Sequence, residues 1–206
     1  MPLNMCMIKF PTNMREAAQI FTEFGYHLSA WPRKLGKHIV SQHIPFWWNY
    51  SYPYHLINDN MNMGINHLLS KTCCLDVDNK ILSEKIFSFL GIKSRSVINE
   101  TMSWQGSLRG YKCLFKSPLI EVDWLTIRTP STPSILELRH GNFDLTNSDS
   151  IVTIYDLVPP SLHPSGIHYE FLTDPLAYKD LPNLPDKLLE LYQDKELQNK
   201  IYSILT

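Results

Sequence analysis

The stretch CCLDVDN, residues 73–79, places two aspartates one residue apart at the end of an apolar run. In a β-strand, residues i and i+2 lie on one face, so Asp76 and Asp78 would project together while Val77 enters the opposite packing layer. Two carboxylates this close repel each other unless a cation neutralises them or one of them holds a proton. Because Mg²⁺ and Mn²⁺ prefer hard oxygen ligands, one interpretation is a metal site.

The alternative interpretation is a strand end that runs into a helix. Residues 80–91, KILSEKIFSFLG, predict an amphipathic helix that begins near Lys80 and ends at Gly91. Asp78 would then be the N-cap of this helix, and Asp76 would be a surface residue. The spacing of the two aspartates alone leaves both interpretations open.

A third carboxylate lies downstream in ILELRHGN, residues 135–142. Glu137 stands among apolar residues, with Arg139 on the same strand face, and an acid inside an apolar strand is costly unless it has a partner. Glu137 is therefore a candidate third ligand, with Asp144 and Asp156 as weaker substitutes. The ordinary alternative is a surface pair between Glu137 and Arg139.

Two further segments carry groups that suit phosphate oxygens. In VPPSLHPSG, residues 158–166, prolines and a glycine predict a stiff turn, and Ser161 and His163 would share a face if the segment is extended. In SLRGYKCLFKSP, residues 107–118, Arg109 and Lys112 flank a glycine and would counter a triphosphate. The alternatives are a rigid loop with incidental polar residues and ordinary solvated cations.

Composition limits the class of protein. The chain has 206 residues, of which 44% are hydrophobic and 19% charged, as in globular proteins. With 19 basic and 20 acidic residues the net charge is −1, so any nucleic-acid surface must be a local patch. The four cysteines form no C-x2-C pair, which argues against zinc, and adjacent Cys73 and Cys74 are expected to be small buried hydrophobes in a reducing compartment. The chain has no apolar run of about 18 residues and no signal-peptide layout, so we expect a cytoplasmic protein without a membrane span.

The element pattern predicts an α+β (mixed α/β) fold, a single domain over residues 1–206 with a central, mostly antiparallel sheet and flanking helices. A capping box at Asn13 and Glu16 predicts a first helix that stops at Gly25. Residues 33–63 are expected to be irregular, with one short helix. The remaining predictions are strands at SVINETMSW (96–104), GYKCLFKSP (110–118), SILELRHG (134–141) and SIVTIYDLVPP (150–160), and a helical tail over 184–206.

Taken together and in this order, these segments resemble the primase–polymerase (prim-pol) branch of the archaeo-eukaryotic primase superfamily, as found in plasmid and phage replication proteins. The resemblance runs from about residue 17 to 191. MGINHLLSKTCCLDVD resembles the hydrophobic-Asp-x-Asp first motif, LELRHG the acidic third motif, and VPPSLHPSGIHYEF the Pro-Pro-Ser-x-His-Pro stretch with its aromatic strand. AAQIFTEFGYHLSAWP with the later LGK (residues 35–37), and LPDKLLELY, are similar to the opening and closing segments. The second motif departs from the family, because Lys112 stands where many members have histidine.

The resemblance implies template-directed DNA primase or DNA polymerase activity with two Mg²⁺ or Mn²⁺ ions. It implies catalytic and metal-binding roles for Asp76, Asp78 and Glu137. The nucleotide-binding residues that it implies are Ser161, His163, Lys112, Arg109 and Arg139. Its expected partners are a single-stranded or primed DNA template, dNTP or NTP, and a helicase domain or protein, with Trp47, Trp48 and Tyr50 as candidates for stacking on bases. A two-metal nuclease, a non-catalytic nucleic-acid-binding replication module and a purely structural α+β domain are the alternatives.

Overall fold

The computed structural model describes residues 10–33, 51–117, 125–141, 154–163 and 165–205. Its strands form two sheets in which every pairing between named strands is antiparallel. The smaller sheet has the order β1 (Leu28–Pro32), β2 (Met61–Asn66), β8 (Tyr155–Leu157). The larger sheet has the order β6 (Leu125–Thr129), β7 (Thr132–His140), β3 (Thr72–Val77), β5 (Tyr111–Lys116), β4 (Met102–Gln105), β9 (Glu170–Phe171). The predicted α+β class with an antiparallel sheet is confirmed.

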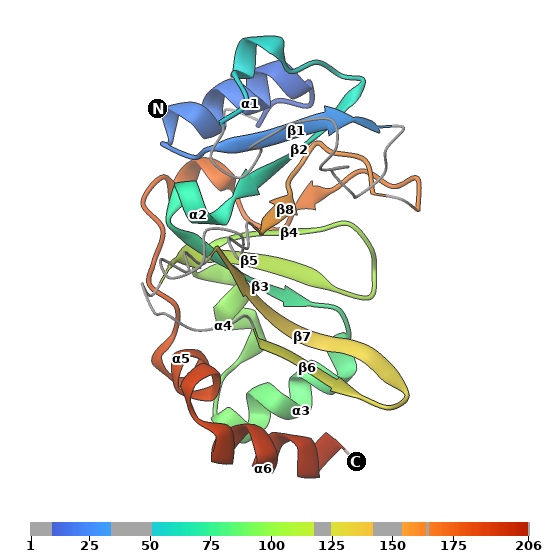
Figure 1. The fold of residues 1–206 in the computed structure, drawn as a ribbon, viewed down its shortest axis with the longest axis vertical. Coiled ribbons are helices and arrows are strands. Elements are labelled where there is room, and N and C mark those ends of the chain that lie inside the picture. The colour runs from blue at the N-terminus through green and yellow to red at the C-terminus, as the bar shows by residue number, and fades with distance from the viewer. Residues whose placement is uncertain (1–9, 34–50, 118–124, 142–153, 164, 206) are drawn as a thin grey trace, which may run out of the picture.

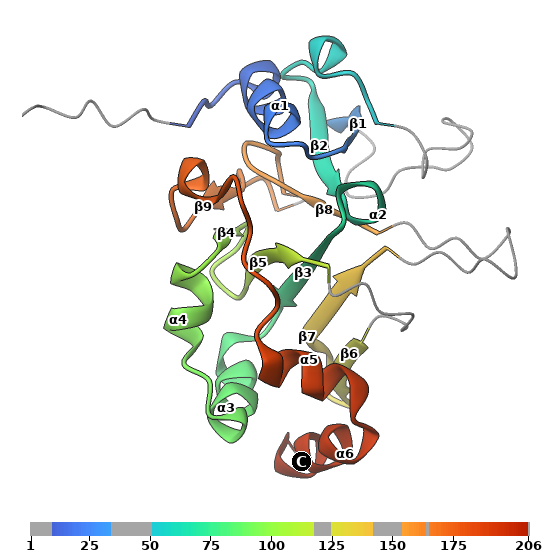
Figure 2. The ribbon, with the colours of Figure 1, turned by 90° about the vertical axis from the view of Figure 1, so that its left-hand side faces the viewer.

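Helices cover the outer side of each sheet, so the molecule is layered (Figures 1 and 2). Helix α1 (Met14–Glu23) packs on the smaller sheet, and α3 (Lys80–Leu90), α5 (Asp186–Gln193) and α6 (Lys195–Leu205) lie below the larger one. The shorter helices are α2 (His67–Ser70), α4 (Ser94–Asn99) and the 3₁₀ turns η4 (Tyr54–Leu56) and η6 (Pro175–Tyr178).

Strand β3 separates two hydrophobic cores. Cys73, Leu75 and Val77 point into the core that the larger sheet shares with α3, α5 and α6. Cys74 points the other way, into the core between the two sheets. Period-two alternation then puts Asp76 on the same face as Cys74, toward the smaller sheet. This is the face on which charged residues of three neighbouring strands meet.

The helix ends confirm several local signals. Asn13 caps α1 by accepting a hydrogen bond from the Glu16 backbone N–H at 2.9 Å. Helix α3 ends at Gly91, whose positive φ of 70° suits the left-handed C-cap that glycine adopts without strain. Cys73, Cys74 and Cys113 are buried free thiols, as expected of small apolar side chains.

Other segments differ from expectation. The strand predicted at SVINETMSW is wrong in its first half, because residues 94–99 form α4, and β4 begins only at Met102. Val97 is buried in the core that the larger sheet shares with α3, α5 and α6, so tertiary packing overrides the β-preference of Val and Ile here. The helical tail is two helices that meet at Asp194, which accepts backbone hydrogen bonds from the first turn of α6.

Some predictions lie outside the described residues: the LGK segment, Cys6, Asp144 and the stacking candidates Trp47, Trp48 and Tyr50. Within the described ranges, none of the helices is both long enough and apolar enough to cross a bilayer.

Candidate active site

The sheet register brings the three predicted carboxylates together. Asp76 on β3 lies directly opposite Glu137 on β7, and Asp78 follows just after the end of β3. One ligand oxygen from each of Asp76, Asp78 and Glu137 lies within 4.8 Å of the others. The Ser134 hydroxyl lies 2.5 Å from Asp78 Oδ2 and 3.1 Å from Glu137 Oε1, so it links these two side chains.

Asp78 does not cap the following helix. The N-cap of α3 is Asn79, whose side-chain oxygen accepts a hydrogen bond from the Leu82 N–H at 3.1 Å. The Asp78 side chain is exposed and turns toward Ser134 and Glu137 instead. The capping interpretation of CCLDVDN is therefore wrong at Asp78, and helix initiation does not account for this carboxylate.

Two cations lie beside Asp76. Lys112 is opposite Asp76 on β5, and its Nζ donates to Asp76 Oδ2. Arg139 is two residues beyond Glu137 on β7, and its Nη1 donates to the same oxygen at 3.2 Å. Arg139 Nε is buried without a hydrogen-bond partner and lies 3.9 Å from Glu137 Oε2. Strands β3, β5 and β7 therefore present a compact group of mixed charge to one face.

A fourth carboxylate completes this group from the smaller sheet. Asp156 on β8 is 2% exposed; its Oδ1 accepts a hydrogen bond from Lys112 Nζ at 2.7 Å and forms an ion pair with Arg139 Nη1 at 3.1 Å. Burial by itself would raise the pKa of Asp156, but the charges of Arg139 and Lys112 and the hydrogen bond from His67 hold it well below its usual range. Asp156 is thus a buried anion.

His67 on α2 holds the other oxygen of this anion. Its Nε2 lies 2.8 Å from Asp156 Oδ2 and its Nδ1 lies 2.9 Å from Thr72 Oγ1. Burial lowers the pKa of His67, and this outweighs the opposing effect of Asp156. Since an ionised carboxylate only accepts, the neutral ring carries its proton on Nε2, and Thr72 donates to Nδ1.

Sequence reasoning missed the importance of Asp156 and His67. The signal for Asp156 was present, because this acid stands in the apolar segment TIYDLV and a buried acid needs partners, as was argued for Glu137. His67 follows β2 with no pattern that marks it. Its role depends on α2 turning the chain so that the ring meets β8, a contact between residues 89 positions apart.

The charged group opens onto a pocket between β3, the β4–β5 turn and the segment after β8. Lys112 on β5 and His163, from the segment after β8, are both part of its wall. The pocket is lined by Asp76, Val77, Asp78, Gly106, Ser107, Gly110, Tyr111, Lys112, His163 and Tyr169. Gly110 is required here, because a Cβ at this position would collide with the Val77 carbonyl oxygen.

The structure separates Ser161 and Arg109 from this pocket's lining. Ser161 is fully buried, and its hydroxyl donates to the Met63 carbonyl and accepts from the Met63 N–H, both at 2.9 Å. Arg109 is exposed in the β4–β5 turn, where its backbone carbonyl accepts from the Lys80 N–H at 3.2 Å. By contrast, His163 lines the pocket and its ring contacts Tyr169 edge-on.

The three carboxylates fit a divalent cation. They offer hard oxygen ligands within 4.8 Å of one another, which is the donor set that Mg²⁺ and Mn²⁺ prefer. Burial raises the pKa of Glu137, and the neighbouring Asp76 and Asp78 raise it further, against the opposing effect of Arg139 and Ser134.

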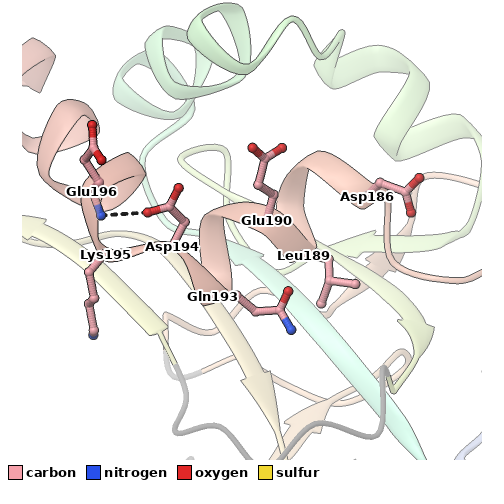
Figure 3. A pocket seen from close by; sticks show the side chains of 7 residues that line it. All are labelled: Asp186, Leu189, Glu190, Gln193, Asp194, Lys195 and Glu196. Atoms are coloured by element: carbon pink, nitrogen blue, oxygen red, sulfur yellow. Dashed lines mark hydrogen bonds between the residues drawn. The ribbon is translucent and has the colours of Figure 1, made fainter.

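A second pocket lies between α5 and α6, away from these residues (Figure 3). Its lining carries four carboxylates and one lysine: Asp186, Glu190, Asp194, Glu196 and Lys195. Asp194 is engaged in capping, since its Oδ1 accepts from the Glu196 N–H at 2.8 Å (Figure 3). The excess of negative charge makes this pocket unsuitable for a triphosphate.

Three clustered carboxylates lie next to two cations on an antiparallel sheet flanked by helices, and this set of oxygen ligands suits a divalent cation. A comparison with models of protein families identifies the family of the chain. The model described as "Bifunctional DNA primase/polymerase, N-terminal" matches residues 29–187, well over half of the chain. The chain belongs to this prim-pol family, which makes it a nucleotidyltransferase-type enzyme of the DNA primase/polymerase kind, with DNA and nucleotides as substrates. A comparison with curated proteins gave no match.

Proposed function

We propose that this chain is a template-directed DNA primase/DNA polymerase in which Asp76, Asp78 and Glu137 hold two divalent cations, Mg²⁺ or Mn²⁺. The observation that carries the proposal is the convergence of these three carboxylates within 4.8 Å on one sheet face. When bound, such ions lower the pKa of an attacking 3′-hydroxyl and neutralise the triphosphate and the departing pyrophosphate.

The chain's own cations bind and orient the nucleotide. A lysine ammonium has three N–H donors. Two of those of Lys112 bind Asp76 and Asp156, which leaves one for a phosphate oxygen. Arg139 supplies a second positive charge on the same face, and His163 also lines the pocket. In the proposed reaction these groups would stabilise the negative charge that develops in the transition state.

Lys112 replaces the histidine that many family members carry, and its contacts support a compatible role. An ammonium buried between two carboxylates stays charged, and the pKa of Lys112 is raised because the attraction of Asp156 and Asp76 outweighs burial. A permanent charge binds phosphate as a point charge and does not exchange a proton at neutral pH. We therefore assign Lys112 to charge stabilisation and not to acid–base work.

Ser161 and Arg109 do not line the pocket, so we assign them roles other than direct contact with the nucleotide. Ser161 fixes the Pro-Pro-Ser segment onto β2 through both of its bonds to Met63, and so aligns the chain that leads to His163. Arg109 projects from the β4–β5 turn beside the pocket, where an exposed cation suits the backbone of a DNA template or primer.

We extend the proposal to the setting of the enzyme: a single catalytic domain that replicates a plasmid, a phage or another mobile element in the cytoplasm. The family match supports the primase/polymerase chemistry in this statement. The helicase partner rests on the resemblance alone and stays a prediction.

The test is synthesis by the purified chain on single-stranded DNA, with and without an annealed primer, in Mg²⁺ or Mn²⁺. Labelled dNTP or NTP reports incorporation, and end-labelled DNA in the same reactions reports release of nucleotides. The proposal expects metal-dependent incorporation. Release of nucleotides without incorporation would identify a two-metal nuclease, and DNA binding without either would identify a non-catalytic replication module.

A further inference from the structure

Asp76 and Asp156 share the same two cations. Lys112 Nζ and Arg139 Nη1 each contact both Asp76 Oδ2 and Asp156 Oδ1. Asp76 is at the pocket, whereas Asp156 is buried behind it on the other sheet. His67 holds the remaining oxygen of Asp156, so both oxygens of the buried carboxylate have partners.

This buried cluster is neutralised without a metal. Ligand atoms of His67, Cys74 and Asp156 do lie within 4.8 Å of one another. However, both ring nitrogens of His67 are already hydrogen-bonded, and burial raises the pKa of the Cys74 thiol well above its ordinary value, which disfavours the thiolate that a metal would need. Lys112 and Arg139 would also repel an incoming cation.

The balance of charge gives Asp156 a different role. Lys112 and Arg139 carry two positive charges, which Asp156 and Asp76 together balance. Asp78 and Glu137 then supply net negative charge for a divalent cation. Without Asp156, both cations would face Asp76 alone, and the surroundings of the three ligands would gain one positive charge.

We propose that Asp156 is a positioning residue, which holds Lys112 and Arg139 between the two sheets so that Asp76 stays available as a metal ligand. His67 supports it by fixing Asp156 in place. The proposal rests on the metal-binding role of Asp76, Asp78 and Glu137 in the proposed function. Under this proposal strand β8 of the smaller sheet contributes to the site by holding the two cations, while the larger sheet supplies the metal ligands.

The experiment measures Mn²⁺ binding to the full chain by titration calorimetry, without nucleotide or DNA. Asp156→Asn keeps the shape but removes the charge, and we expect it to raise the Mn²⁺ dissociation constant about tenfold, the scale of one unit charge acting across several ångströms. The control is Asp180→Asn, the same chemical change at an exposed carboxylate paired with Lys116, which should leave Mn²⁺ binding unchanged.

A second substitution separates positioning from a general loss of structure. Lys112→Met in the Asp156→Asn background removes the unbalanced cation, so Mn²⁺ affinity should recover to within roughly threefold of wild type, whereas a general loss of structure would not be repaired by this second change. A double variant that binds Mn²⁺ no more tightly than Asp156→Asn, or an unchanged dissociation constant in folded Asp156→Asn, would overturn the proposal. If Asp156→Asn does not fold, His67→Gln provides the test: Mn²⁺ affinity should fall by roughly threefold, and unchanged affinity would overturn the proposal.

The outcome is distinguishable from failure of the proposed function. Wild-type chain that binds Mn²⁺ and loses affinity on Asp156→Asn, yet incorporates no nucleotide, would support the role of Asp156 and contradict the polymerase assignment. Wild-type chain that binds no Mn²⁺ would overturn both.

Discussion

Asp76 and Glu137 face each other directly across the antiparallel pair β3–β7. Like charges at opposed positions of a sheet destabilise it. Lys112 offsets this repulsion by pairing with Asp76, whereas Glu137 has only a longer contact, 3.9 Å from its Oε2 to Arg139 Nε. The fold therefore retains a carboxylate cluster that a bound cation would stabilise. This relationship connects the stability of the protein to its proposed chemistry.

The first prediction concerns that coupling. Mn²⁺ should stabilise the wild-type chain against urea, and chelation by EDTA should reverse the effect, because a ligand that binds only the folded state adds to its stability. Glu137→Gln should raise the stability of the metal-free chain by about 0.5–1 kcal/mol through relief of repulsion, and abolish most of the Mn²⁺ effect. Equal stabilisation of wild type and Glu137→Gln by Mn²⁺ would remove Glu137 from the ligand set.

The second prediction separates Asp78 from its neighbour Asn79. Asn79→Ala should lower the free energy of unfolding by about 1 kcal/mol, since it removes the N-cap of α3. Asp78→Ala should change that free energy by less than about 0.5 kcal/mol, because its side chain is exposed, while weakening Mn²⁺ binding at least tenfold. Urea denaturation and Mn²⁺ titration of both variants measure these effects. The opposite pattern would restore Asp78 as a helix cap.

The third prediction separates Ser161 from His163. Ser161→Ala should cost about 1–3 kcal/mol of stability, because it leaves buried polar groups of Met63 unsatisfied. His163→Ala should change stability little and raise the dissociation constant for dNTP about tenfold, the value of a hydrogen bond to a charged group. Nucleotide affinity unchanged by His163→Ala would exclude the histidine from the binding site.

The fourth prediction concerns pH. Burial lowers the pKa of His67 in the folded chain, with Arg139 and Lys112 acting in the same direction and Asp156 opposing them. An unfolded histidine takes up a proton near pH 6.5, so the unfolded state binds more protons below that pH, and stability falls as the pH drops. His67→Gln should therefore cost stability at pH 7.5, and this cost should shrink as the pH approaches 5.5. A cost independent of pH would contradict a neutral buried His67.

Local signals predict much of this fold and site. The period-two placement of Asp76 and Asp78 and the Asn13 cap are properties of adjacent residues, so they can be read from short segments. The strand predicted around Val97 is wrong because burial of Val97 in the core beneath the larger sheet decides the structure of that segment. The contact between His67 and Asp156 escapes local reasoning because it depends on how the two sheets stack. The capping residue of α3 differs from expectation by a single position.

The most direct test of the central claim is metal-dependent primer extension by wild type and by the double variant Asp76→Asn/Asp78→Asn. The variant removes two of the three proposed ligands and keeps their shape, and Asp180→Asn serves as the matched control at a distant carboxylate. We predict that wild type and the control incorporate dNTP with Mn²⁺ or Mg²⁺, and that the double variant, folded by circular dichroism, loses at least about a hundredfold in rate. Incorporation by the double variant at the wild-type rate would contradict the account.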